Sequence, residues 1–166
     1  MIVATGMLAA CANTAPSEPP EDPAIATPPQ TRLHRNAEQA RVAENYERFW
    51  RVSQAVPHHS AERQRSELAR VTADPLASTM LGNLAQQRSQ GVTLYGQIQP
   101  RISDVRVESE RAVVTDCQDA SRSGQADASG QQRTVGLARN PVSGTLQRGA
   151  DGAWRMVRID YPGGSC

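Results

Sequence analysis

The sequence predicts an α+β domain in which N-terminal helices pack on one face of a mostly antiparallel sheet. Two patterns carry this prediction. Up to about residue 90, apolar residues recur every three or four positions, which is typical of amphipathic helices. After residue 92, apolar and polar residues alternate, which is typical of half-buried strands. Because the helices come first and the strands follow, we expect the α+β architecture.

Three helices are expected before the first strand. The first begins near Asn36, ends at Pro57 and carries three of the six aromatic residues of the chain, Tyr46, Phe49 and Trp50. Their spacing places them on one apolar stripe. We therefore expect this helix to lie on the sheet.

The other two helices are predicted from their capping residues. Ser60 is expected to cap a short second helix. Asp74 is expected to cap the third, with Pro75 at the first helical position, where its missing N–H costs nothing. Gly91 is expected to end the third helix.

Two hairpins are predicted in the second half of the chain. The first spans residues 101–119, and we expect a loop of about four residues because no Asn-Gly pair marks a tight turn. The second joins residues 145–148 to residues 154–161. Its connection contains Asp151-Gly152, which supplies the positive φ of a tight turn.

The segments around the hairpins are less regular. A strand is expected over residues 92–98, and another over residues 134–137. Residues 120–132 are rich in Ser and Gly, so we expect a mobile loop there. Pro141 is expected to mark a bulge or an edge position, because proline cannot donate to a strand ladder.

Composition and charge restrict the classes of partner. The 166 residues suffice for one domain with a core, although only 4% are aromatic. The net charge is +1, and arginine is the only basic residue apart from histidine. Because the arginines are spread along the chain and balanced by acids, we expect no nucleic-acid partner.

The N-terminus resembles a bacterial lipoprotein signal. Residues 1–11 are apolar and end in Leu8-Ala9-Ala10-Cys11, a small-residue cleavage site before a cysteine. This pattern predicts export and a lipid on Cys11, which anchors the protein to the outer face of the cell membrane. The signal is short and lacks a basic start, so we expect the true start codon to lie upstream. The alternative is an incidental apolar start with an ordinary cysteine.

Residues 12–35 are predicted to form a linker. Proline, alanine, serine, threonine and acidic residues dominate this segment, and little of it could be buried. A linker of this kind would hold the domain of residues 36–166 above a membrane surface.

A disulfide is expected between Cys117 and Cys166. The chain has three cysteines, and lipidation of Cys11 leaves these two in an exported domain. An even pair in an oxidising compartment usually forms a bridge. The alternatives are two free thiols or a bridge to a partner chain.

Several motifs of the domain together resemble exported actinobacterial proteins of the nuclear transport factor 2-like (NTF2-like) superfamily. They are a Y-x-x-[FY]-W motif in the first helix, a V-x-V-x-x-x-x-A-x-V-x-D-C-x-D hairpin, a G-x-W-[RK]-V strand and a final Gly-Ser-Cys. The matching residues are Tyr46, Phe49, Trp50, Val105, Val107, Ala112, Val114, Asp116, Cys117, Asp119, Gly152, Trp154, Arg155, Met156 and Cys166. The resemblance implies a cone-shaped α+β domain with a curved sheet.

The resemblance also implies a cavity between the sheet and the first helix. The residues expected to line it are Tyr46, Trp50, Tyr95 and Asp104. Ketosteroid isomerases and dehydratases of this superfamily place an acid, a base and tyrosine or histidine donors in such a cavity.

The sequence shows no acid/base dyad for such a reaction. Asp116 and Asp119 flank a cysteine and a loop, so turn capping is expected of them. His58 and His59 are neighbours on a loop and seldom converge on one ion, so neither a metal nor another cofactor is expected.

The function expected from these observations is that of a non-catalytic envelope lipoprotein. Its domain would bind a small ligand or dock on another envelope protein. Two alternatives remain: a cavity enzyme of the isomerase or dehydratase type, and an assembly subunit of a secretion or conjugation machine.

Overall fold

The computed structural model describes residues 35–166. The predicted signal with Cys11 and the predicted linker up to residue 34 lie outside the described residues. The helical elements are α1 (Ala37–Ala55), the 3₁₀ turn η1 (Val56–His58), α2 (Ala61–Leu68) and α3 (Leu76–Ser89). The strands are β1 (Val92–Gly96), β2 (Ile102–Glu108), β3 (Arg111–Gln118), β4 (Ser123–Asp127), β5 (Asn140–Arg148) and β6 (Trp154–Asp160).

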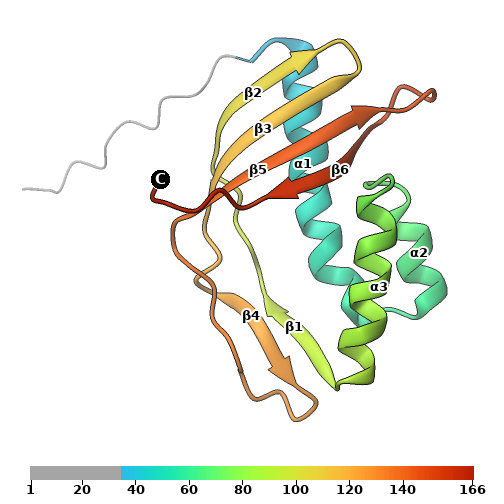
Figure 1. The fold of residues 1–166 in the computed structure, drawn as a ribbon, viewed down its shortest axis with the longest axis vertical. Coiled ribbons are helices and arrows are strands. Elements are labelled where there is room, and N and C mark those ends of the chain that lie inside the picture. The colour runs from blue at the N-terminus through green and yellow to red at the C-terminus, as the bar shows by residue number, and fades with distance from the viewer. Residues whose placement is uncertain (1–34) are drawn as a thin grey trace, which may run out of the picture. The chain divides into compact units, whose positions relative to one another are not determined.

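The strands form two antiparallel sheets. The larger has four strands in the order β2-β3-β5-β6, and the smaller is a ribbon of β1 and β4. Figure 1 shows α1 running behind the four strands and extending below them, where α2, α3 and the ribbon of β1 and β4 lie. Among residues 35–166, none of the helices combines the length and the apolar character needed to cross a bilayer.

The core lies between α1 and one face of the four-stranded sheet. The apolar stripe of α1 packs on side chains that alternate along the strands. The largest buried side chains of this core are Tyr46, Phe49, Leu146, Trp154 and Met156. The predicted position of the first helix on the sheet is thus confirmed.

The start of α1 is fixed both locally and by the sheet. Asn36 and Gln39 form a reciprocal capping box, with N···O distances of 2.9 and 3.0 Å. The Gln39 amide also donates to the carbonyl oxygen of Val105 at 2.8 Å. Glu38 accepts from the indole N–H of Trp154 at 2.7 Å. These contacts attach the first helical turn to β2 and β6.

The start of α3 differs from the prediction by one residue. The helix begins at Leu76, so Pro75 precedes the first helical position instead of filling it. Asp74 still caps the helix, because its Oδ1 accepts from the backbone N–H of Ser78 at 3.1 Å and from its hydroxyl at 2.6 Å. Gly91 follows the helix with a φ of 63°, as predicted.

The turn of the first hairpin is tighter than predicted. Only Ser109 and Glu110 separate β2 from β3, and Glu108 pairs with Arg111. The expectation of about four residues was wrong because Ser109 itself adopts a positive φ of 54°, a conformation that usually requires glycine or asparagine. In the second hairpin, the positive φ is at Gly152, as predicted.

Strand β4 lies inside the segment predicted to be a mobile loop. It pairs with β1 from Val92↔Asp127 to Gly96↔Ser123. The alternation that predicts strands is nearly absent here, because Ser123 and Ala126 are its only buried residues. The strand predicted over residues 134–137 is absent, although its backbone hydrogen-bonds to residues 120 and 123.

Pro141 lies in β5, a central strand of the sheet, but at a point where only β3 pairs with it. It pairs with Cys117 of β3, but the pairing of β5 with β6 begins only at Ser143↔Asp160. No neighbouring strand therefore requires a donor from Pro141 on the β6 side. The bulge of this hairpin lies further along, where the register between β5 and β6 shifts.

The register shift adds one residue to β6. Leu146 pairs with Met156, whereas the preceding Thr145 pairs with Arg158. Val157 is therefore the extra residue, because β6 advances by two residues where β5 advances by one. Such a bulge reverses the alternation of the side chains that follow it.

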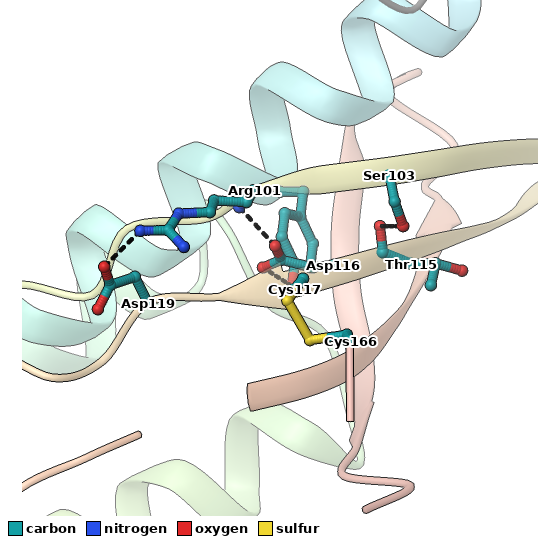
Figure 2. The surroundings of a disulfide bond; sticks show 8 residues. Arg101, Ser103, Thr115, Asp116, Cys117, Asp119 and Cys166 are labelled. Carbon is teal, nitrogen blue, oxygen red and sulfur yellow. Dashed lines mark hydrogen bonds and ion pairs between the residues drawn. A yellow bond between two sulfur atoms is a disulfide. The ribbon is translucent and has the colours of Figure 1, made fainter. Parts of the chain in front are cut away.

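The predicted disulfide between Cys117 and Cys166 is present, with a Cα–Cα distance of 5.7 Å. The neighbours of Cys117 in β3, Asp116 and Gln118, are buried in the core. Alternation therefore places the cysteine on the opposite face of the sheet. Figure 2 shows the segment that carries Cys166 attached to β3 through this bond.

Candidate functional site

An apolar cavity of about 430 Å³ lies between α1, α3, β1 and the end of β6. Its wall is mainly aliphatic and aromatic. The apolar residues that define it are Phe49, Leu76, Met80, Leu94, Ile98 and Ile159. The cavity is thus the space where the C-terminal half of α1 extends past the four-stranded sheet.

The helical spacing of α1 explains which of its residues reach the cavity. Phe49, Trp50, Ser53 and Gln54 line it. Residues four apart in a helix lie one above the other on the same face. Trp50 and Gln54 are such a pair, so their polar groups lie on one strip of the wall.

These two residues carry buried hydrogen-bond donors without a well-formed hydrogen bond among residues 35–166, although the Trp50 N–H lies near the Tyr46 hydroxyl and acts to lower the pKa of that phenol. Trp50 Nε1 and Gln54 Nε2 are both buried atoms, and the whole Trp50 residue is only 5% exposed. Buried polar groups in proteins are nearly always hydrogen-bonded. Two other polar side chains of the wall do have partners within the chain: the Ser53 hydroxyl donates to the carbonyl oxygen of Trp50 at 3.0 Å, and the Thr79 hydroxyl donates to that of Pro75 at 3.1 Å.

The indole ring of Trp50 is held in place by two aromatic neighbours. Its centroid lies 5.1 Å from that of Phe49 and 6.1 Å from that of Tyr46, and both contacts are edge-to-face. The orientation of the Trp50 N–H is therefore fixed before any ligand is present.

The four residues expected to line the cavity have different environments. Trp50 lies on the wall, as described, whereas Tyr46 is fully buried beneath it. Tyr95 and Asp104 lie elsewhere, which corrects the expectation for both. Because Leu94 faces the cavity, its neighbour Tyr95 points away, and the Tyr95 hydroxyl donates to the carbonyl oxygen of Thr134 at 2.8 Å.

Asp104 is directed away from the core for the same reason. Its neighbour Val105 is turned into the core. The Asp104 carboxylate accepts from the Arg106 guanidinium at 2.7 Å instead. The alternation itself assigns Asp104 to the polar face of the strand, because Val105 and Val107 form the apolar face.

Tyr46 and Asp116 form a buried polar pair in the core. The Tyr46 hydroxyl donates to Asp116 Oδ2 at 2.9 Å, and the backbone N–H of Arg101 donates to Oδ1 (Figure 2). The turn-capping role expected of Asp116 is therefore wrong. The carboxylate is directed inward from β3 and only 1% of the residue is exposed.

Burial controls the protonation of this pair. Desolvation raises the pKa of the Asp116 carboxyl above its ordinary value. Burial also raises the pKa of the Tyr46 phenol, and the neighbouring carboxylate raises it further, so the phenol remains protonated and donates its hydrogen bond. Neither residue lines the apolar cavity, so we assign the pair to the structure of the core.

Asp119 has the turn-capping role expected of it. Its Oδ1 accepts from the backbone N–H of Ser121 at 3.1 Å and from the Ser121 hydroxyl at 2.7 Å. These bonds hold the pKa of the Asp119 carboxyl below its usual range. Figure 2 shows that the Arg101 guanidinium reaches the same carboxylate.

Within the described ranges, no three histidine, cysteine or acidic side chains come close enough to hold a metal ion. His59 instead lies beside Glu67, with 2.9 Å between Nδ1 and Oε2. Sequence reasoning missed Gln54 as a residue of the site. The signal for it was the four-residue spacing from Trp50.

No protein-family model matches the chain, and no curated protein sequence matches it. Solved structures do resemble its fold. The intermembrane space region of the chloroplast protein ARC6 superposes with a TM-score of 0.55 at 11% identity, over 76% of this chain and 96% of that one.

Two bacterial structures are similar over nearly the same part of the chain. An NTF2-like protein from Cytophaga hutchinsonii has a TM-score of 0.50 at 12% identity, and the match covers 75% of this chain and 96% of that one. The Kfla4162 protein from Kribbella flavida also has a TM-score of 0.50, at 17% identity, over 75% of this chain and 90% of that one. Identities this low establish the fold alone. The predicted fold class is confirmed: helices packed on a curved antiparallel sheet, in the arrangement of NTF2-like proteins.

Proposed function

We propose that the domain binds a small, largely apolar ligand in the cavity through a hydrogen-bond acceptor on that ligand. The observation that carries the proposal is the pair of buried donors without a well-formed hydrogen bond, Trp50 Nε1 and Gln54 Nε2, on a mainly apolar wall. A buried donor without an acceptor costs about 1–3 kcal/mol. A ligand carbonyl, ether or hydroxyl oxygen placed between them would remove that cost.

The size and stiffness of the site support binding of a small molecule. A volume of about 430 Å³ lies within the range of small-molecule sites, which hold roughly 300–1,000 Å³. The aromatic contacts of Trp50 with Tyr46 and Phe49 fix its orientation in advance. A preformed donor reduces the entropy that binding would otherwise lose.

The chemistry of the wall favours binding over turnover. Of the residues that line the cavity in the described part of the chain, none is a carboxylate or a histidine, and Tyr161 is the only titratable side chain. General acid–base catalysis needs a group that exchanges protons near neutral pH. The buried carboxylate of Asp116 is committed to Tyr46 and to the Arg101 backbone. The domain therefore acts as a receptor for its ligand.

We further propose that the protein is exported and anchored by a lipid on Cys11, with residues 12–35 as the tether that lets the domain deliver its ligand to, or dock on, another envelope protein. The Cys117–Cys166 disulfide supports an oxidising compartment. Mass spectrometry of the native protein tests the anchor: a diacylglyceryl mass on Cys11, lost in Cys11→Ser, is expected. Unmodified Cys11 in membrane-free protein would refute it.

The ligand proposal is tested with two naphthalene probes that differ in one acceptor, 2-acetonaphthone and 2-ethylnaphthalene. We expect the ketone to bind at least about tenfold more tightly, which corresponds to about 1.4 kcal/mol. In the double variant Trp50→Phe/Gln54→Leu, this preference should disappear while the hydrocarbon still binds. Trp154→Phe is the matched control, because its N–H donates to Glu38 outside the cavity. Equal binding of both probes by the wild-type protein would refute the proposal.

A further inference from the structure

A second hollow lies between α1 and α2, on a different face of α1 from the apolar cavity, and holds about 610 Å³. Four arginines line it: Arg48 and Arg51 from α1, Arg63 from α2, and Arg70 from the turn that follows α2. This arginine groove, as we name it, is independent of the ligand site proposed above.

The arginine groove contains one carboxylate against these four positive charges. Glu67 accepts from Arg63 at 2.7 Å and lies beside His59. The hydrogen bond from Arg63 is the main reason that the pKa of Glu67 lies below its usual range, so Glu67 is ionised at neutral pH. With His59 neutral, the lining has an excess of three positive charges, whereas the whole chain has a net charge of +1. The positive charge is therefore concentrated locally.

Two of these arginines have no internal counter-ion. Within residues 35–166, no carboxylate lies within 4 Å of Arg48 or Arg70, and Arg51 reaches Glu47 only at 4.0 Å. Three arginines of the sheet behave differently. Each of the following lies 2.6–2.7 Å from an aspartate: Arg106, Arg155 and Arg158. In the groove, four guanidinium groups therefore lie together, and two of them, those of Arg48 and Arg70, have no carboxylate partner among residues 35–166.

The lining of the groove also contains apolar residues. These are Val52, Ala55 and Val71, of which Val71 is buried. A ligand with a negatively charged group and an apolar or carbon-rich remainder can contact both the arginines and these apolar residues.

We propose that the arginine groove binds the phosphate group of a ligand. A phosphate monoester carries about 1.5–2 negative charges and three strong acceptor oxygens, so it can satisfy several guanidinium groups at once. A carboxylate carries one negative charge and would leave most of the excess positive charge of the groove uncompensated. Arginine is suited to this role because its planar fork of N–H donors matches phosphate oxygens in pairs. The phosphate belongs either to a soluble ester or to a phospholipid headgroup.

The test compares two double variants that remove the same charge. Arg48→Gln/Arg70→Gln removes the arginines of the groove without counter-ions, and Arg65→Gln/Arg139→Gln removes exposed arginines outside it. Glycerol 3-phosphate binding is measured by calorimetry at constant ionic strength, with sodium sulfate as the competing anion. Vesicle binding is measured by co-sedimentation with phosphatidylglycerol and with phosphatidylcholine. Circular dichroism verifies that each variant is folded.

We expect wild-type protein to bind the soluble ester, the anionic vesicles or both, and the groove variant to lose at least about tenfold in affinity. The control variant should lose less than about twofold. Binding of the ester alone identifies a soluble ligand, and binding of the vesicles alone identifies a lipid headgroup. Absence of both, or an equal loss in the two double variants, would overturn the proposal, because the effect would then be one of general charge.

Discussion

The four-stranded sheet and the β1–β4 ribbon use the same antiparallel pairing but are held by different forces. In the sheet, β3 alone buries Ala112, Val114, Asp116 and Gln118 against the helical side, and β5 and β6 add Leu146 and Met156. In the ribbon, β1 has no fully buried residue, and β4 buries only Ser123 and Ala126. Apolar burial therefore stabilises the sheet, whereas backbone pairing and turn hydrogen bonds stabilise the ribbon.

This difference matters for the cavity because its wall combines both regions. Ile159 comes from the last strand of the sheet, and Leu94 and Ile98 come from β1 and the segment after it. Regions with few buried apolar contacts open locally at low free-energy cost. The ribbon side of the wall is thus the side that adjusts to the shape of a ligand.

Loss of the disulfide should give the largest effect, because the bond constrains both regions. The loop from Cys117 to Cys166 contains β4, β5 and β6, with a sequence separation of 49. On the chain-entropy model, closing it stabilises the fold by about 4 kcal/mol, which is an upper estimate. Cys117→Ser/Cys166→Ser should therefore unfold at a lower urea concentration than wild type. Wild-type protein with reductant should follow the variant. Identical midpoints for oxidised wild type and variant would show that the bond contributes nothing.

A pair of leucine substitutions compares the two regions directly. Leu146→Ala in the sheet removes a fully buried side chain and should cost about 2–5 kcal/mol of unfolding free energy. Leu94→Ala in the ribbon removes a partly exposed side chain and should cost about 1 kcal/mol. Chemical denaturation measures both. Equal losses of unfolding free energy in the two variants would show that the ribbon is as tightly packed as the sheet, which would contradict the difference between the two regions described above.

The buried pair of the sheet predicts a pH dependence. Asp116→Asn leaves only one acceptor oxygen for two donors, Tyr46 and the Arg101 N–H, and should cost about 1–3 kcal/mol at neutral pH. The folded-state pKa of Asp116 is raised, so between that pKa and the ordinary value of 3.8 the folded state binds more protons than the unfolded state. The Asp116 contribution to stability therefore increases as pH falls through this window.

Unfolding free energies of wild type and Asp116→Asn, measured at a series of pH values, isolate this contribution from that of the other carboxylates. We expect the gap between the two proteins to widen as the pH decreases from neutral. A gap that is constant with pH would mean that Asp116 has the same pKa in the folded and unfolded states.

The turn of the ribbon should show the smallest effect, with the opposite dependence on pH. Asp127 Oδ1 accepts from the Ser129 hydroxyl at 2.6 Å, from the Ser129 N–H at 2.9 Å and from the Gln131 N–H at 3.1 Å. These bonds hold the pKa of Asp127 below its usual range, so its contribution is present above the ordinary pKa and is lost as pH falls through the lowered one.

Hydrogen exchange measures the Asp127 effect locally. In Asp127→Ala, the amides of Ser129 and Gln131 should exchange several times faster, while the amides of β3 and β5 are unchanged. Asp127→Asn retains Oδ1 and is the matched control, with a smaller change expected. Faster exchange throughout the sheet in Asp127→Ala would show that the ribbon and the sheet unfold as one unit.

The four-stranded sheet was predictable from the sequence, whereas of the ribbon only β1 was, as the strand expected over residues 92–98. Alternation around Val105 and Val114 identified the first hairpin, because burial on one face imposes a period of two. Strand β4 has the sequence Ser-Gly-Gln-Ala-Asp, which carries no such period, and its partner β1 lies about thirty positions earlier. Pairing that depends on backbone hydrogen bonds between distant segments leaves almost no local signal.

The candidate site was predictable only in part for similar reasons. The apolar stripe of α1 identified Trp50, but Gln54 was overlooked because a polar residue is usually assigned to solvent. The partner of Tyr46 was not foreseen, since Asp116 is 70 residues away in the sequence. Contacts between residues so far apart in the sequence are set by the topology of the fold, and local sequence patterns carry no information about that topology.

The bulge at Val157 determines which residues of β6 face the cavity. Before it, Trp154 and Met156 face the core; after it, Ile159 and Tyr161 reach the cavity because the alternation has been shifted by one position. A regular strand that kept Val157 would instead turn Arg158 and Asp160 inward, whereas deleting Val157 would remove the bulge and leave Ile159 and Tyr161 facing the cavity. The bulge thus determines that the pocket is apolar and not charged, and in the divergence of such domains this strand can lose its extra residue without losing the pocket.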